Sequence, residues 1–456
     1  MPLPAISKNN EVYNADGSPK NPYSKVCALL DESGLEDFRA ASGRACTQAE
    51  IDSFTFPLDP LQWRTVPTDW VPRIITKDHW AKIAAGVEQR LRALNKFLFD
   101  LYNGDQDIVP RKVVYSSAHY NPEMQKVKPA KEVYAHIYGI DLVHLGEGNF
   151  VVLEDNLRIP SGITYQLKCR SLSSQFFPEM NASHSVAPYS IGATYRKLFS
   201  SVSDTSDPGT VILTDGKLGS AFFEHRYLSE LLGVPLVEGT DLFIDGAGNV
   251  KAKTADGIIK VDVIYRRVQD LELFVPGLTE AYRKGKVALV NAMGTGVADD
   301  KLVFLWVHEM IRRYLGEEPI LPHAKSYNLI DGESRRYALR NIESLVFKVR
   351  EGYGGLGVYI MPEMGNTYRQ ALTQQIIERP QAFVAQETLD FSKHVSLEEG
   401  GAALEERYID LRVYAVQDGD GNVTVFPGGL TRVSKPRTRI TNNSSGGSCK
   451  PTWVLS

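Results

Sequence analysis

The sequence predicts an α/β (α+β) protein, and three stretches of the chain carry this prediction. Between residues 204 and 293, short apolar runs alternate with a helix-like stretch, which is typical of a small parallel α/β unit. After residue 344 the chain becomes richer in strand-like runs. Residues 78–104 carry apolar side chains at spacings of three and four, which predicts one long helix.

Helix-like and strand-like runs can be placed along most of the chain. The long helix should begin at Asp78, which can cap it, and should end at Gly104. Further helices are expected at 221–232 and 301–315. Residues 1–60 contain scattered Gly, Pro, Asn and Asp, so they are expected to be irregular. Strands are expected at 112–115, 133–140, 149–153, 210–214, 234–237, 261–265, 287–291, 345–349, 383–386, 408–416 and 422–426.

Composition and charge exclude several classes of protein. Lys and Arg number 51 and Asp and Glu number 55, so the chain lacks the basic footprint of a general nucleic-acid binder. No apolar run approaches the roughly 20 residues that span a bilayer, and the N-terminus does not resemble a signal peptide. The four cysteines are far apart, so neither a zinc site nor a disulfide framework is expected. A reduced cytoplasmic protein, with no membrane or nucleic-acid partner, is the simplest expectation.

A lysine followed by a glycine-rich loop is the first candidate for phosphate binding. Lys348 lies near the end of an apolar run, and four glycines follow it between residues 352 and 357. Glycines let backbone N–H groups approach a phosphate closely, and the lysine adds a point charge. The lysine precedes the glycines, so the segment is not a Walker A loop. A flexible hairpin with an ordinary surface lysine remains the alternative.

Two acidic residues and an asparagine form a candidate metal site. Glu154 and Asn156 project from the same face of an expected strand, and Asp141 lies on the strand before it. Carboxylate and amide oxygens are hard ligands that suit Mg²⁺. The alternative is a solvated strand end. The segment runs directly into Arg158 and then Ser161, which favours a functional site.

Other signals are weak when each is taken alone. An apolar strand ends at Gln386 and Glu387, where backbone groups could meet an adenine edge. Asp410 and Arg412 share a strand face. Asp299 or Asp300 is expected to cap the helix that Lys301 enters.

An arginine pair and a histidine mark the α/β unit. Arg266 and Arg267 end one of its strands, where a substrate carboxylate or an ion pair explains them about equally well. His225 is a weak candidate for substrate binding, because a lone histidine at the start of a helix is more often structural.

Together these residues resemble the ATP-grasp ligases. In most members the metal strands follow the nucleotide elements, whereas here they come first, so the chain is similar to the circularly permuted, glutathionylspermidine synthase-like family. The resemblance extends from about residue 62 to the C-terminus. Departures are a short segment at 268–275, a 350–357 loop closer to that of D-alanine–D-alanine ligases, and no Arg two residues before Asp141.

The resemblance implies a circularly permuted ATP-grasp fold with a small Rossmann-like pre-ATP-grasp unit. Residues 1–60 would form an N-terminal extension and residues 61–203 the metal-binding lobe. Residues 204–300 would form the pre-ATP-grasp unit and residues 301–456 the nucleotide-binding lobe.

The resemblance also implies a reaction, with ATP and Mg²⁺ as cofactors. A carboxylate would attack the γ-phosphate of ATP, and an amine would displace phosphate from the resulting acyl phosphate. Asp141, Glu154 and Asn156 would hold the metal. Nucleotide binding falls to Lys301, Lys348, Gly352, Gly354, Gly355, Gln386, Glu387, Leu389 and Arg412. Catalysis is assigned to Arg158, Arg412 and Lys348, and substrate binding to Ser161, Gly162, Arg266 and Asn443.

The implied substrates are a small carboxylic acid and an amine, such as an amino acid, a short peptide or a polyamine. Neither molecule is identified by the sequence, and a partner enzyme and the oligomeric state stay open. Two other functions remain: a nucleotide-binding partner protein without turnover, and a kinase that phosphorylates a small molecule.

Overall fold

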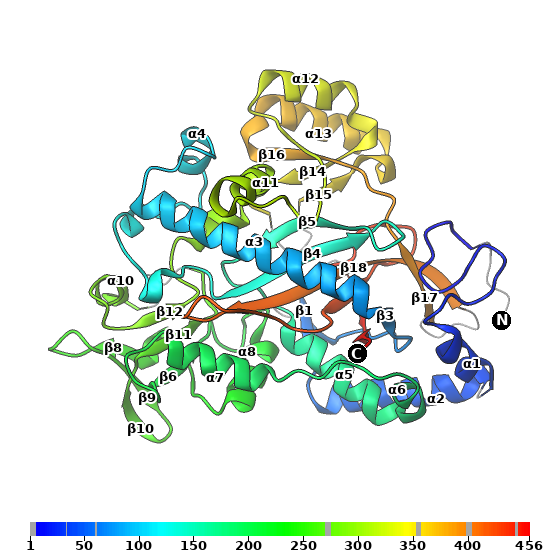
Figure 1. Ribbon diagram of the computed structural model, residues 1–456, viewed down its shortest axis with the longest axis horizontal. Helices are drawn as coiled ribbons and strands as arrows, with labels where there is room; N and C mark the ends of the chain where they lie inside the picture. Colours follow the sequence, from blue (N-terminus) through cyan, green and yellow to red (C-terminus); the bar gives the residue numbers. More distant parts are fainter. Residues whose placement is uncertain are drawn as a thin grey trace.

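The centre of the molecule is a seven-stranded sheet of antiparallel pairs to which both halves of the chain contribute (Figure 1). The computed structural model describes residues 6–32, 34–59, 62–269, 275–352, 357–397, 404–442 and 446–456. In the sheet, the long β18 (Leu404–Gln417) lies directly beside β4 (Ile137–His144). The other strands are β5 (Phe150–Asn156), β17 (Lys393–Leu397), β19 (Val423–Val425), β20 (Leu430–Val433) and β21 (Ser448–Lys450).

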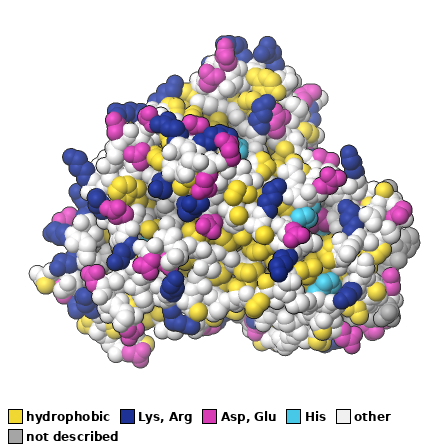
Figure 2. Space-filling view, viewed as in Figure 1, with side chains coloured by type: hydrophobic (Ala, Val, Ile, Leu, Met, Phe, Trp, Pro, Cys, Tyr) yellow, Lys and Arg dark blue, Asp and Glu magenta, His cyan; other side chains and the backbone are white. Residues whose placement is uncertain are grey.

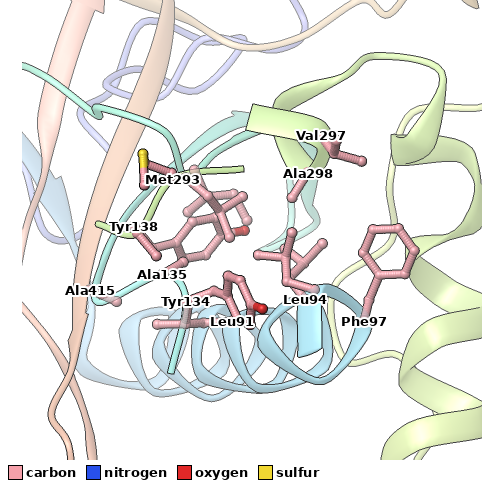
Figure 3. Packing of buried hydrophobic residues seen from close by; sticks show 14 of the residues in the cluster. Leu91, Leu94, Phe97, Tyr134, Ala135, Tyr138, Met293, Val297, Ala298 and Ala415 are labelled. Carbon is pink, nitrogen blue, oxygen red and sulfur yellow. The ribbon is translucent and has the colours of Figure 1, made fainter. Parts of the chain in front are cut away.

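The long helix α3 (Lys77–Asn103) covers one face of this sheet. Its apolar stripe, which includes Leu91 and Leu94, packs against Tyr138 of β4 and Ala415 of β18 (Figure 3). The cap differs from the prediction, since the Thr76 hydroxyl rather than Asp78 accepts the His79 N–H. Thr precedes the first apolar turn in the position that an N-cap occupies.

The predicted parallel α/β unit is confirmed. Its strands lie in the order β12-β11-β6-β7, and every neighbouring pair is parallel. An antiparallel meander was not predicted, because its strands are short and β10 is exposed or partly exposed throughout, so the apolar pattern is weak. The parallel strands are β6 (Thr210–Leu213), β7 (Leu236–Val237), β11 (Val263–Arg266) and β12 (Ala288–Val290), and the meander is β8 (Leu242–Ile244), β9 (Val250–Thr254) and β10 (Gly257–Lys260). The helices are α7 (Ile191–Ser201), α8 (Phe222–Leu232) and α10 (Leu278–Arg283).

A smaller antiparallel sheet, in the order β13-β16-β14-β15, forms the upper part of Figure 1. Leu345 and Phe347 face the two helices of this part, so Lys348, on the alternate face, points away from them. The strands are β13 (Ser326–Asn328), β14 (Leu345–Val349), β15 (Val358–Ile360) and β16 (Phe383–Glu387), and the helices are α12 (Gly332–Arg340) and α13 (Asn366–Glu378).

Three local predictions are wrong. The segment expected to be irregular contains α1 (Ser24–Glu32) and α2 (Gly34–Ile51), because alanines spaced every four residues bury a face that gives little periodic signal. Residues expected as a strand form the short helix α4 (Arg111–Tyr115), which Pro110 begins. The segment 301–315 is broken into a 3₁₀ turn (Val303–Trp306), α11 (Val307–Met310) and a π-helical turn (Ile311–Leu315).

The N-terminal part of the chain contacts its C-terminal end, because β3 pairs with β22 in parallel. The elements not yet named include these two strands. They are β1 (Thr55–Asp59), β2 (Gln62–Thr65), β3 (Arg73–Ile75), β22 (Thr452–Val454), α5 (Ile163–Phe176) and α6 (Pro178–Ala182). Lys and Arg side chains are interspersed with Asp and Glu on the face that Figure 2 shows. No helix in the described part of the chain is long and apolar enough to cross a membrane.

Candidate functional site

The three predicted metal ligands meet on two neighbouring strands. Asp141 of β4 lies opposite Glu154 of β5, and Asn156 lies opposite Gly139. Asp155 points to the other face, where Arg90 of α3 binds it through two contacts of 2.6 and 3.0 Å. This buried pair fixes which face of β5 points toward α3. Because side chains alternate along a strand, Glu154 and Asn156 lie on the face away from that helix.

Two arginines neutralise the buried carboxylate of Asp141. Arg412 of β18 binds both oxygens, with Nε–Oδ1 at 2.6 Å and Nη2–Oδ2 at 2.7 Å, and its Nη2 lies 3.5 Å from Glu154. Arg432 of β20 adds a contact of 2.8 Å and also binds Asp410. Burial by itself raises the pKa of Asp141, but the two guanidinium groups more than offset it and hold this pKa well below its usual value. The stretch from Gly428 to Arg432 stands out in the sequence, but no role was assigned to Arg432 from it, although a charged residue in an apolar strand is a signal for a buried ion pair.

Both predicted phosphate-binding lysines lie beside Glu154. Lys348 is buried, and its Nζ donates to the carbonyl of Leu153 at 3.4 Å. The pKa of Lys348 is lowered to about 8, because burial outweighs the opposing charge of Glu154 and the nearby ammonium of Lys301 acts in the same direction as burial. Lys301 donates to the carbonyl of Gly352, and its Nζ lies 3.9 Å from Glu154. The two lysines therefore concentrate positive charge at the site, and a bound anion would stabilise their charged form.

A single cleft joins this charged centre to the predicted adenine end. Its apolar walls come from β5, β14 and β15, and Gln386, Glu387 and Leu389 line it from the end of β16. Gln386 donates to Ser326 at 3.1 Å, and Glu387 accepts from the hydroxyl of Tyr327. The cleft is lined by Asp141, Leu153, Glu154, Val346, Lys348, Val358, Ile360, Gln386, Glu387, Thr388, Leu389, Phe391, Asp410, Arg432, Arg439, Ile440, Thr441 and Asn442.

The segment after β5 is held by an aspartate that the sequence reasoning assigned to a helix cap. The carboxylate of Asp299 accepts the backbone N–H groups of Leu157 at 2.5 Å and Arg158 at 3.1 Å. Burial raises the pKa of Asp299 to about 6. The neighbouring Asp300 does accept the N–H of Leu302, but it also pairs with Arg350 at 2.8 Å.

Arg158 contacts a histidine that no sequence signal singled out. Its Nη1 lies 3.1 Å from Nδ1 of His119. A guanidinium can only donate, so Nδ1 is the acceptor and His119 carries its proton on Nε2. Burial and the charge of Arg158 both lower the pKa of His119. His119 therefore stays neutral near pH 7 while it orients Arg158.

The predicted substrate loop is anchored to the α/β unit. Gly162 donates its N–H to the buried Glu224 of α8 at 2.7 Å, and Arg267 donates to Ser161 and pairs with Glu224 at 2.7 Å. Of the two explanations for this arginine pair, the ion pair is correct for Arg267.

The predicted contact of Arg266 with a substrate carboxylate is not supported. All three of its side-chain nitrogens donate to backbone carbonyls, among them those of Asn291 and Ala292. His225 is likewise buried, and its Nδ1 binds the hydroxyl of Thr214 at 2.8 Å, which indicates a structural role. Gly354, Gly355 and Asn443 lie outside the described residues.

Known proteins with similar sequences cover most of this chain. An uncharacterized protein of Mycobacterium tuberculosis is 39% identical over 98% of this chain and 84% of its own length. An uncharacterized protein of Synechocystis is 40% identical over 86% of this chain and 85% of its own. A putative glutamate–cysteine ligase of Frankia casuarinae is 34% identical over 98% of this chain, but the match covers 53% of that longer protein.

A solved structure shares the fold. A glutathione synthetase-like effector from Globodera pallida, in its apo form, superposes with a TM-score of 0.60 at 10% identity, over 92% of this chain and 98% of its own. Residues 72–434 match the circularly permuted ATP-grasp type 2 family. In this chain the acidic strands β4 and β5 precede the lysine-bearing β14 and the strand end at β16, which is the permuted order. The resemblance found in the sequence is thus confirmed, and the chain belongs to the circularly permuted ATP-grasp type 2 family.

Proposed function

We propose that this protein is an ATP- and Mg²⁺-dependent carboxylate–amine ligase that works through an acyl phosphate and releases ADP and phosphate. The observation that carries the proposal is the single cleft. Two adjacent carboxylates, a buried lysine and the end of β16, where we expect adenine to bind, all line it. Family membership supports the use of ATP. The name of the Frankia relative supports an amino acid as one substrate.

The residues at the charged end fit a magnesium ion. Asp141 and Glu154 are neighbouring carboxylates, and the side-chain amide of Asn156 adds a carbonyl oxygen. In the free protein Arg412 and Arg432 hold both oxygens of Asp141, so the metal would have to share this carboxylate with them. The described ranges contain no group of three or more His, Cys, Asp or Glu side chains that could hold a metal ion, so this site would offer the metal two carboxylates and one amide. When bound, Mg²⁺ would neutralise the phosphate oxygens and so favour phosphoryl transfer.

The chain's own residues supply the remaining functions. Lys301 and Lys348 hold the phosphates, and Arg412 stabilises the charge on the transferring phosphoryl group. The substrate carboxylate oxygen forms a bond to the γ-phosphorus as the bond to ADP breaks. Arg158, oriented by His119, binds the acyl phosphate that results. The amine nitrogen then bonds to the acyl carbon, phosphate leaves, and the amine loses a proton to give the amide.

The test is ADP release from the full chain with ATP, Mg²⁺ and mixtures of small acids and amines. We expect release only when both an acid and an amine are present, and none from Lys348→Met. Lys253→Met is the matched control, because Lys253 is exposed on β9 and lies outside the residues that line the cleft. A stable phosphorylated product formed without amine would identify a kinase. Nucleotide binding without turnover of any mixture would identify a partner protein.

A further inference from the structure

Two cysteines that are far apart in the sequence meet in the core of the protein. The Sγ atoms of Cys169, in α5, and Cys449, in β21, lie 3.0 Å apart, although 280 positions separate the two residues along the chain. Both residues are at most 1% exposed. They belong to one cluster of buried apolar side chains, which also contains Trp453.

Regular secondary structure holds both cysteines in place. The N–H of Cys449 donates to the carbonyl of Pro67 at 2.9 Å, and its own carbonyl accepts from the N–H of Asp69 at 2.8 Å. The strand β21 also pairs with β20, where Arg432 lies opposite Cys449. Cys169 lies within the 14-residue helix α5. The two sulfurs are therefore brought together by a helix and a strand rather than by loops.

The two sulfurs are close enough to bond with little movement. The sulfurs of a disulfide are about 2.0 Å apart, so closing the gap from 3.0 Å requires an approach of about 1 Å in total. A thiol is a weak hydrogen-bond donor and acceptor, so the hydrogen bonding that the pair would lose is small. The hydroxyl of Thr68, 3.5 Å from Sγ of Cys449, also donates to the carbonyl of Val66 at 3.2 Å and would keep that partner.

We propose that Cys169 and Cys449 are a site of reversible oxidation, at which hydrogen peroxide converts the two thiols into an intramolecular disulfide. One sulfur attacks the peroxide, breaks its O–O bond and becomes a sulfenic acid, with release of one water. The other sulfur then forms the S–S bond and a second water leaves. The two thiols together lose two hydrogen atoms, and the peroxide is reduced to two waters. A dithiol reductant reverses the reaction by thiol–disulfide exchange.

The bond would connect two parts of the candidate site. Helix α5 begins at Ile163, directly after Ser161 and Gly162 of the predicted substrate loop. Strand β21 pairs with β20, whose Arg432 binds Asp141 in the cleft. A disulfide between α5 and β21 would therefore fasten the substrate loop to the strand that carries this arginine. The oxidation itself does not depend on the reaction proposed for the cleft.

Burial sets the conditions of the test. It raises the pKa of the Cys169 thiol, so little thiolate forms near pH 7 and oxidation should be slow. The folded full chain is therefore treated with hydrogen peroxide at about pH 8.5, near the ordinary pKa of a thiol. It carries Cys46→Ala, because Cys46 is exposed and would react first. Remaining thiols are then alkylated, and the peptides are identified by mass spectrometry without reductant.

We expect a pair of peptides linked through Cys169 and Cys449, and loss of this link after dithiothreitol. The urea midpoint of the oxidised protein should fall when dithiothreitol is added, because the bond closes a long loop in the unfolded chain. Cys27→Ala, which removes another buried cysteine, should leave the link intact, whereas Cys169→Ala should prevent it.

The comparison of the Cys46→Ala protein before and after dithiothreitol does not require Cys169→Ala to fold. Thiols at both positions that stay reduced through the peroxide treatment would show that the pair is ordinary core packing and would overturn the proposal. Sulfinic acids without a link, a link that involves Cys27, or a urea midpoint that dithiothreitol leaves unchanged would overturn it as well.

Discussion

The clearest prediction concerns Lys348. Its buried positive charge destabilises the free protein and becomes favourable only when an anion is bound. Burial lowers its pKa from the ordinary 10.5 to about 8. A depressed lysine pKa means that the unfolded chain binds more protons between about pH 8 and 10.5, so stability should rise with pH across that window. At pH 7 the charged Lys348 therefore lowers the free energy of unfolding by about 3 kcal/mol relative to a neutral side chain, because one pKa unit corresponds to about 1.4 kcal/mol.

Lys348→Met should accordingly make the free protein more stable at pH 7, by about 3 kcal/mol at most, and should abolish its stabilisation by ATP. The measurement is the unfolding midpoint in urea and on heating, with and without an ATP analogue and Mg²⁺, for this variant and for Lys253→Met. Lys253 is exposed on β9, so its replacement should change neither quantity. If Lys348→Met were less stable than the wild type and still stabilised by nucleotide, the reasoning from burial and charge would be refuted.

Three further predictions concern residues around the cleft. An ATP analogue at a hundred times its dissociation constant should stabilise the wild type by about 2.7 kcal/mol in the presence of Mg²⁺. Glu154→Gln should reduce this stabilisation, whereas Glu147→Gln, at an exposed position, should not. Equal stabilisation of the two variants by the analogue would exclude Glu154 as a metal ligand. Arg90→Met should lower the free energy of unfolding in urea by about 3–5 kcal/mol, because it leaves the buried Asp155 without its partner. A decrease of less than about 1 kcal/mol would contradict the role given to this pair. Because the pKa of Asp299 is raised to about 6, its contribution to stability should be complete below pH 3.8 and lost as the pH rises through about 6. Asp299→Asn should remove this dependence, and an unchanged pH profile of unfolding would show that another group causes it.

The local part of the site could be predicted from sequence because strand alternation is a short-range rule. Glu154 and Asn156 lie two residues apart, so any extended conformation places them on one face. In the structure, the same alternation places Lys348 on the face of β14 away from Leu345 and Phe347. The α/β unit was also predictable, because its strands are buried and apolar.

The errors have a common physical origin in weak or ambiguous periodicity. The helix α2 buries small residues such as Ala41 and Ala45, which contribute little to an apolar pattern. The run at 111–115 is too short to distinguish strand from helix, and its β-branched residues favoured the wrong choice.

By itself, the sequence determined the mixed α/β class, the permuted order of the motifs, and the residues that alternation brings to one face of a strand. Only the tertiary structure decided which charges meet. Arg432 reaches Asp141 from 291 positions away, and His119 reaches Arg158 from 39 positions away, across contacts that no local pattern encodes. The structure also assigned Arg266 to backbone carbonyls and Arg267 to Glu224, although the two residues are adjacent and chemically identical. A buried cation must be paired, but its partner is set by the packing of distant elements, and this packing is a property of the whole fold.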